Sequence, residues 1–201
     1  TYKGDTMVMN LHMPGTFNVA NALAAITLAH EMGVSLEIIK KVLNEFTGIW
    51  RRFEYIADLE LENDANPVTI ISDYGHHPDA IAETLKGARA FFPGRRLVLV
   101  YQPHQHNRTQ KLFNEFADVL QEPDVLLLSD IYDVTGRVDE EERETHSSQL
   151  VEAIREGENE DRYQYSGNLE QTRSQLESIM QPGDVVIIMG AGDIDTLARA
   201  F

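Results

Sequence analysis

Short runs of almost entirely apolar residues recur along the chain, and amphipathic segments of helical period separate them. The four clearest runs, which predict strands, are PVTIISDY (67–74), RRLVLVYQP (95–103), DVLLLSDIY (124–132) and DVVIIMGAG (184–192). Helices are predicted over residues 78–92, 109–121, 147–157 and 169–180, and a weaker strand over residues 162–167. A strand that is apolar on both sides must be covered on both faces, which is typical of parallel sheets. The alternation therefore predicts an α/β fold, with a mostly parallel sheet and helices on both faces.

The first fifty residues have a different pattern. The elements predicted there are a strand over residues 5–13 and helices over residues 18–30 and 36–46. Ser35 is a suitable N-cap for the second helix. The stretch TGIWRRFEYI (47–56) then breaks the helical pattern, and we interpret it as a hinge into a second unit.

The charge of the chain argues against one broad class of function. The formal net charge is −16, whereas proteins that bind the phosphate backbone of nucleic acids need basic patches, so we expect no nucleic-acid partner. Between Asp139 and Asp161 there are ten acidic residues and two arginines, a composition typical of a solvated surface. The chain has no cysteine and no apolar run as long as a membrane span. We therefore expect no disulfide, no thiolate metal site and no membrane insertion.

Polar residues gather where the predicted strands end. The clusters are Asp73–His77, Gln102–Arg108, Asp130–Asp133 and Gly190–Asp193. The carboxyl ends of parallel strands meet at one edge of a sheet, and open α/β sheets bind ligands at that edge, near the point where the strand order reverses. The pattern therefore predicts a functional site at the carboxyl edge.

The histidines of these clusters are compatible with more than one kind of site. They are His76, His77, His104 and His106. With a carboxylate from Asp73 or Asp130 they could bind a metal ion, because imidazole and carboxylate are common ligands. They could also form hydrogen bonds at loop starts or contact an anionic substrate. Because the sequence lacks the wider ligand sets of known metal sites, we expect no tight metal site.

Other arrangements of catalytic residues are weaker or missing. Gly190-Ala191-Gly192 could offer backbone amides to an anion, or it could simply be a tight turn after the last strand. The sequence contains neither a G-x-S-x-G nucleophile motif nor a G-x-x-x-x-G-K-[ST] phosphate loop. Because the chain also begins as if within a fold, we expect it to be a piece of a longer polypeptide. We expect that these 201 residues by themselves do not hydrolyse ATP.

Six segments together resemble the Mur ligase family. They are GTFNVANALAAITLAHEMGV (15–34), GIWRRFEYI (48–56), SDYGHHPDAI (72–81), VYQPHQHNRT (100–109), LSDIYDVTG (128–136) and GDVVIIMGAGDI (183–194), in the order expected of the family. The resemblance implies that residues 1–49, a strand followed by helices, are the last part of a central ATP-binding domain. It implies that residues 50–201 are a Rossmann-like third domain, and that the phosphate loop lies upstream.

The resemblance also implies an activity. The segments are most similar to those of the family members that join L-alanine to UDP-N-acetylmuramate in peptidoglycan synthesis. In that reaction ATP converts a carboxylate into an acyl phosphate, which the amino group of alanine attacks. The implied partners are UDP-N-acetylmuramate, L-alanine and ATP with Mg²⁺, whose ligands would lie largely in the rest of the protein, and the implied location is the cytoplasm. The third domain would close over the nucleotide and present the amine.

Individual positions acquire roles from the resemblance. The residues near the nucleotide would be Asn18, Asn21, Arg52 and Asp73. The residues on the acceptor side would be Tyr74, His76, His77, His104 and Arg108. Arg52, which would reach the phosphates, and His76 would act in catalysis. Asp73 would hold the ribose, and Arg108 would pair with the carboxylate of alanine, a role that suits a guanidinium group.

Two departures from the family pattern keep other assignments open. Phe17 stands where members usually have histidine, and Gln105 stands where they often have arginine, which removes a charge near the amino acid. The family members that recycle a murein tripeptide are therefore an alternative. A metal-dependent hydrolase built on the histidines is an alternative of a different class, and a binding module without catalysis is a third.

Overall fold

The computed structural model describes residues 6, 8–61, 65–133, 145–155 and 161–201. Eight of the ten acidic residues between Asp139 and Asp161 therefore lie outside the described residues. In chain order the elements are α1 (Thr16–Glu31), α2 (Leu36–Glu45), β1 (Glu54–Leu59), β2 (Val68–Asp73), α3 (Pro78–Phe91), β3 (Leu97–Tyr101), α4 (His106–Lys111), α5 (Phe113–Val119), β4 (Val125–Ser129), α6 (Ser147–Ile154), β5 (Tyr163–Gly167), α7 (Leu169–Ile179), β6 (Val185–Met189) and α8 (Asp195–Ala198).

The described strands form one sheet in the order β1-β2-β6-β3-β4-β5. From β2 to β5 all neighbours are parallel, and β1 pairs antiparallel with β2 at the edge. β6, the last strand in the chain, lies between β2 and β3, so that Asp73 and Tyr101 are both in register with Met189. The strand order therefore reverses at β6, which gives the sheet the kind of switch point at which α/β proteins bind ligands.

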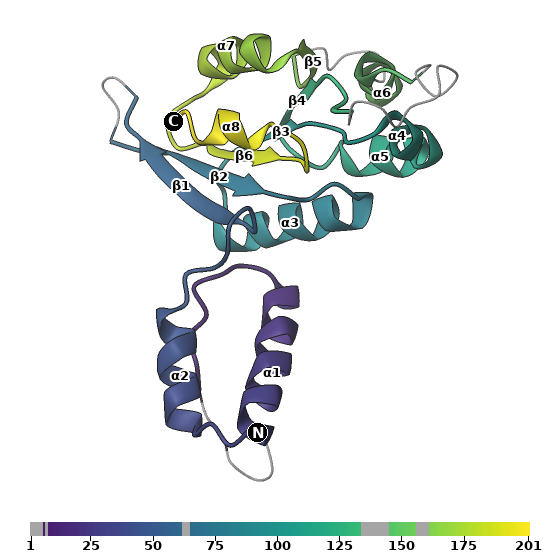
Figure 1. The fold of residues 1–201 in the computed structure, drawn as a ribbon. Coiled ribbons are helices and arrows are strands. Elements are labelled where there is room, and N and C mark those ends of the chain that lie inside the picture. Colours follow the sequence, from purple (N-terminus) through teal and green to yellow (C-terminus); the bar gives the residue numbers. More distant parts are fainter. Residues whose placement is uncertain (1–5, 7, 62–64, 134–144, 156–160) are drawn as a thin grey trace.

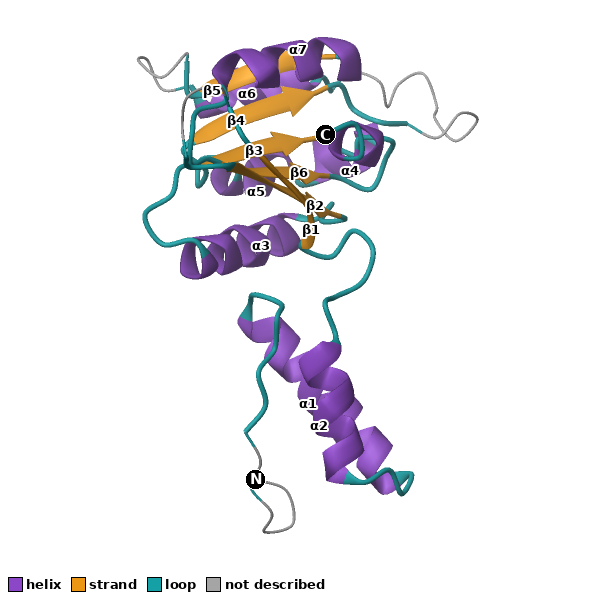
Figure 2. Cartoon of the chain, turned by 90° about the vertical axis from the view of Figure 1, so that its left-hand side faces the viewer, coloured by secondary structure: helices purple, strands orange, loops and turns teal. Residues whose placement is uncertain are grey.

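Helices cover both faces of the sheet (Figure 1, Figure 2). On one face, Ile81 of α3 and Phe116 of α5 belong to a buried apolar cluster. On the other face, Leu176 of α7 belongs to a second cluster. Successive residues of β6 alternate between the two, because Ile187 faces the first cluster and Ile188 the second. Burial on both faces explains the uninterrupted apolar runs and confirms the predicted mostly parallel, doubly covered sheet.

Several elements differ from the prediction, among them β1 and the helix after β3. The sequence pattern did not predict β1, whose residues alternate between exposed and half-buried and include Glu54 and Asp58. An antiparallel edge strand of this kind has no continuous apolar run. The helix predicted over residues 109–121 begins at His106 and is divided into α4 and α5 at Leu112, whose φ of −113° lies outside the helical range.

α1 and α2 form a helical hairpin that extends away from the sheet on the side of α3 (Figure 1, Figure 2). The side chain of Ser35 caps α2, as predicted. The strand predicted over residues 5–13 is not formed by residues 8–13. A strand needs a backbone partner, whereas the N–H of Asn10 donates to the side chain of Asn44.

Much of the apolar surface of this hairpin is uncovered. Leu23, Leu28 and Val42 are each more than half exposed. A cavity of about 900 Å³ lies between the hairpin and α3, and Val19 and Ile26 are among its apolar walls. Contiguous exposed apolar surface of this kind usually marks a contact with another part of a protein. None of the described helices is long and apolar enough to cross a membrane.

A buried ion pair fixes the start of β6. Asp184 is 1% exposed, and its two carboxylate oxygens each accept a hydrogen bond of 2.9 Å from the guanidinium group of Arg96. Arg96 also donates to the carbonyl of Ile179 at the end of α7. The pair therefore connects β6 to β3 and α7, and it helps to set the register in which Met189 reaches the carboxyl edge.

Asp184→Ala should lower the free energy of unfolding by about 3 kcal/mol, because it leaves a partly buried guanidinium without its carboxylate. Urea denaturation of this variant and of the unsubstituted protein measures the loss. The matched control is Glu177→Ala, which removes an exposed ion pair with Arg173 one helical turn away and should cost less than about 0.5 kcal/mol. Equal losses in the two variants would contradict the role given to the buried pair.

Candidate active site

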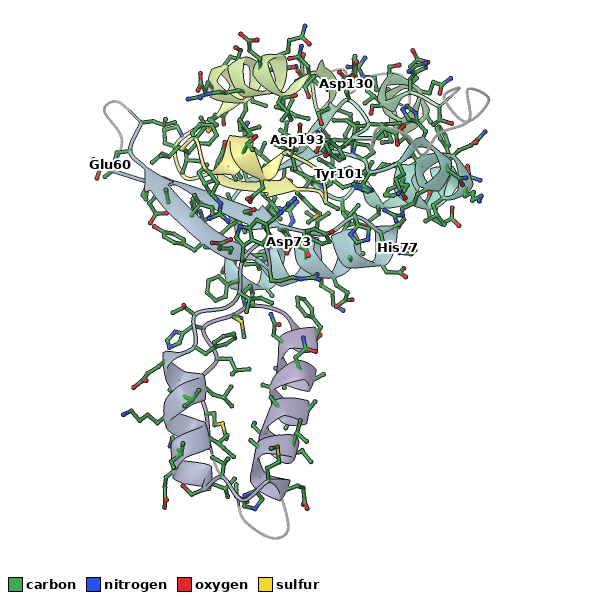
Figure 3. The ribbon with its side chains drawn as sticks, viewed as in Figure 1. Glu60, Asp73, His77, Tyr101, Asp130 and Asp193 are labelled. Atoms are coloured by element: carbon green, nitrogen blue, oxygen red, sulfur yellow. The ribbon has the colours of Figure 1, made fainter. Side chains whose placement is uncertain are left out.

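The carboxyl ends of four strands and the hinge meet at one edge of the sheet. The N–H of Tyr74, after β2, donates to the carbonyl of Arg51 in the hinge at 2.7 Å. The N–H of Gln102, after β3, donates to the carbonyl of Met189 in β6 at 3.0 Å. Figure 3 shows Asp73 near the point where the chain from α2 reaches the sheet, and Asp130 toward β5. The clusters predicted at strand ends therefore do lie along one edge.

Asp73 joins the end of β2 to the hinge. It is 5% exposed, and its two oxygens accept hydrogen bonds from the N–H of Phe53 at 2.8 Å and from that of Gly75 at 2.7 Å. Burial raises the pKa of Asp73 above its usual value, although both hydrogen bonds and the nearby Arg52 and Arg51 oppose the rise. Each carboxylate oxygen has a further lone pair, which can accept a hydrogen bond from a ligand hydroxyl.

A row of aromatic side chains runs from the hinge to the loop after β3. The guanidinium carbon of Arg52 lies 5.5 Å from the centroid of the Tyr74 ring, and that ring lies 5.3 Å from the ring of His76. The rings of His76 and His104 are 6.4 Å apart, and His104 stacks on Tyr132 at 5.6 Å. The structure thus brings together Arg52, Tyr74 and two of the predicted histidines.

Arg108 lies at the end of this row and affects both histidines. Its Nη1 is 3.5 Å from the carbonyl oxygen of His104. Burial lowers the pKa of His76 and of His104, and the positive charge of Arg108 lowers both pKa values further. The two imidazoles are therefore neutral near pH 7, and each has one N–H donor and one lone pair that can accept a proton. Nδ1 of His104 is buried and has no hydrogen-bond partner within the described residues.

Three other predicted site residues lie apart from this row. His77 is exposed, and its Nδ1 accepts a long hydrogen bond of 3.4 Å from the N–H of Asp79, which caps α3. Asn18 donates to the carbonyl of Pro14 at 2.7 Å, and Asn21 is exposed on the same helix. In the described part of the chain, no hydrogen bond connects either asparagine to the row, and their roles stay predictions.

The turn from Gly190 to Gly192 is tightly packed. Nη2 of Arg51 donates to both carbonyls, at 3.1 Å in the case of Gly192, and Gln102 accepts a hydrogen bond of 3.1 Å from the N–H of Ile194. Gly190 has φ of +155°, and a Cβ there would lie 2.8 Å from the carbonyl oxygen of Gln102, so only glycine fits. These contacts support the tight-turn interpretation, because the turn directs carbonyl oxygens toward a cation.

Within the described ranges, no three histidine or acidic side chains converge as potential ligands of a metal ion. His76 and His104 instead contact aromatic rings, and the charge of Arg108 acts on both of them. These contacts offer no support for the alternative of a metal-dependent hydrolase.

The family resemblance assigned no role to Arg51, which the structure places at the centre of the edge. Arg51 is 6% exposed, whereas its neighbour Arg52 is exposed. Arg51 and Phe53 have φ of 54° and 47°, values that are uncommon for residues other than glycine. Two adjacent arginines in a linker carry no signal of which one is buried. Only the contacts after folding distinguish them.

These features define a class of protein: an α/β domain that the chain enters through a hinge, with arginines and neutral histidines along the edge where its strand order reverses. Residues 51–192 match the family described as "Mur ligase, glutamate ligase domain". Since the match covers more than half of the chain, the chain belongs to the Mur ligase family.

Individual relatives agree with this assignment. The UDP-N-acetylmuramate–L-alanine ligase of Nitrosomonas eutropha is 43% identical over 194 residues, which are 96% of this chain and 40% of that relative. The structure of the UDP-N-acetylmuramate-alanine ligase of Thermotoga maritima superposes with a TM-score of 0.72 at 26% identity, over 98% of this chain and 40% of that one. The structure of a murein peptide ligase of Psychrobacter arcticus superposes with a TM-score of 0.59 at 26% identity, over 98% of this chain and 38% of that one. The chain thus spans about 40% of the length of the curated relatives it matches.

Arg108→Met should raise the pKa of His76 and of His104, because it removes a cation that disfavours their protonated forms. Titration of the imidazole protons by NMR measures both values. In the unsubstituted protein, the lowered pKa values mean that the unfolded chain binds protons first, so stability falls as the pH drops below about 6.5. The substitution should weaken that dependence.

Arg173→Met, on the surface of α7, is the matched control and should leave both histidine pKa values unchanged. If Arg108→Met also left them unchanged, the arrangement of Arg108 beside the two histidines would be wrong.

Proposed function

We propose that this chain is the carboxyl-terminal part of an ATP-dependent ligase that joins L-alanine to UDP-N-acetylmuramate in peptidoglycan synthesis. The observation that carries the proposal is the row of Arg52, Tyr74, His76 and His104, with Arg108 beside it, at the carboxyl edge of a Mur ligase domain. The relatives and the solved structure named for the alanine reaction support the choice of substrates.

The proposed reaction needs an uncharged amine and a stabilised phosphate leaving group. The amine nitrogen of alanine forms a bond to the carbonyl carbon of the acyl phosphate, the bond from that carbon to the phosphate oxygen breaks, and the amine loses a proton. Neutral His76 can accept that proton, because its lowered pKa keeps its lone pair free. Arg108 can pair with the alanine carboxylate, and Arg52 can offset the charge on the phosphate.

The nucleotide would bind on the hinge side of the edge. We propose that Asp73 accepts hydrogen bonds from the ribose hydroxyls and that Asn18 and Asn21 lie near the adenine. His77 would lie on the acceptor side while capping α3. ATP would require Mg²⁺, whose ligands we place largely outside residues 1–201. The proposed location is the cytoplasm, where ATP and UDP-linked precursors are found.

The proposal assigns residues 1–49 to the end of a central ATP-binding domain and residues 50–201 to the third domain. The family match begins at residue 51, at the boundary that the hinge predicts. The uncovered apolar surface of α1 and α2 supports a contact with the remainder of that central domain. In this arrangement, closure of the third domain would bring Arg52 and Asp73 onto the nucleotide.

The full-length protein should form product from UDP-N-acetylmuramate, ATP, Mg²⁺ and L-alanine, and residues 1–201 alone should not hydrolyse ATP. Because Gln105 removes a charge near the amino acid, the same assay should include the murein tripeptide as acceptor. We expect kcat/KM for alanine to exceed that for the tripeptide by at least about 100-fold, the discrimination that a few kcal/mol of differential binding provides. A higher value for the tripeptide would replace this function with the recycling reaction.

A further inference from the structure

We propose that Arg51 is a positioning residue for the ligase reaction, which holds the hinge in the one conformation that directs Arg52 and Tyr74 into the site. The inference rests on the proposed function. Arg51 lies where the chain enters the domain, and its side chain points into the protein, whereas that of Arg52 is exposed.

The side chain of Arg51 fastens the hinge to the opposite end of the domain sequence. Nη2 donates to the carbonyls of Gly190 and Gly192, and Nε lies 3.8 Å from the carboxylate of Asp195. The side chain is 7% exposed. Hydrogen bonds from a charged donor are stronger than neutral ones, and burial shields them from water. The tether therefore holds residue 51 against the turn that follows β6.

The backbone around Arg52 needs such a tether. Arg51 and Phe53, which flank it, both have positive φ, an unfavourable conformation for residues other than glycine that persists only where the surroundings impose it. The carbonyl of Arg51 accepts a hydrogen bond of 2.7 Å from the N–H of Tyr74, and its N–H donates to Glu54 at 2.8 Å. The peptide units before and after the Cα of residue 51 are thus both fixed, and the direction of the next side chain follows.

Arg51 also acts directly on the tyrosine of the site. Its guanidinium carbon lies 5.0 Å from the centroid of the Tyr74 ring, and that of Arg52 lies 5.5 Å from the same centroid. Two cations over one ring restrict where the ring can lie. Tyr74 in turn contacts His76, so a displacement of Arg51 would also change where His76 lies.

A network of ion pairs supports the tether. Asp195 accepts hydrogen bonds from Ser72 of β2 at 2.6 Å and from Arg199 at 3.3 Å, and Arg199 pairs with Glu54 of β1. Glu54 also accepts a hydrogen bond from the N–H of Arg51, so these residues form one connected network. Residues 51–54 are therefore part of the third domain.

The side chains of the segment before Arg51 are more exposed. Trp50 is 66% exposed, Ile49 is 58% exposed, and Gly48 has φ of +110°. Movement between the two units would therefore occur at residues 47–50, and Arg52 would travel with the third domain as it closes.

A double-mutant cycle in the full-length protein tests the proposal. Arg51→Met keeps the aliphatic stem and removes the donors. It should lower kcat about 10- to 100-fold, the usual effect of a small displacement of a catalytic group, with KM for L-alanine unchanged within about twofold. Because Arg51 acts partly through Arg52, the same substitution in an Arg52→Ala background should lower kcat by a clearly smaller factor than in the unsubstituted protein.

Arg95→Met is the matched control, because Arg95 also donates to backbone carbonyls, those of Pro67, Gly183 and Asp184, at the opposite end of the strands. Its effect on kcat should be the same in both backgrounds. If Arg51→Met lowered kcat by the same factor in the Arg52→Ala background as in the unsubstituted protein, the proposal would be overturned and Arg51 would be a purely structural residue. If Arg51→Met fails to fold by circular dichroism, Arg51→Lys is subjected to the same cycle and judged by the same criterion.

Failure of the proposed function would be seen separately. If the unsubstituted protein uses the tripeptide rather than alanine, kcat of the four variants is measured with the tripeptide as acceptor. The coupling between Arg51 and Arg52 is still expected in that reaction.

Discussion

The position of β6 between β2 and β3 is the constraint on which the site depends. β6 is the last strand of the chain, yet it pairs with both neighbours along its whole length and brings Met189 level with Asp73 and Tyr101. The buried pair of Asp184 with Arg96 sets where the strand begins. Because the turn after β6 accepts hydrogen bonds from the side chain of Arg51, the end of the domain helps to order the hinge at its start.

The chemistry of the edge contrasts with the charge of the whole chain. The protein carries a formal net charge of −16, yet Arg51, Arg52 and Arg108 gather at this edge with two neutral histidines. Burial is the first cause of the lowered histidine pKa values, and the nearby cations add to it. A local concentration of fixed positive charge suits the anionic groups of ATP and an acyl phosphate, while neutral imidazole suits a step that removes a proton.

The sequence predicted the parallel sheet, its two helical layers and the gathering of polar residues at strand ends, because burial on both faces leaves uninterrupted apolar runs. It did not reveal β1, since an edge strand with one exposed face needs no such run. It also did not distinguish Arg51 from Arg52, because burial of one arginine depends on carbonyls that lie about 140 residues later. The individual roles of the predicted site residues came from the family resemblance, and Asn18, Asn21 and His77 also lie apart from the row.

The central claim is that the carboxyl edge of this sheet is one wall of the active site. Hydrogen–deuterium exchange of the full-length protein, with and without a non-hydrolysable ATP analogue, Mg²⁺ and UDP-N-acetylmuramate, tests it most directly. We expect protection to increase in residues 51–54, 73–77 and 102–108, and to stay unchanged at the amino ends of the strands, in residues 65–68 and 94–97. Protection at the amino ends, or none at the carboxyl edge, would contradict this account.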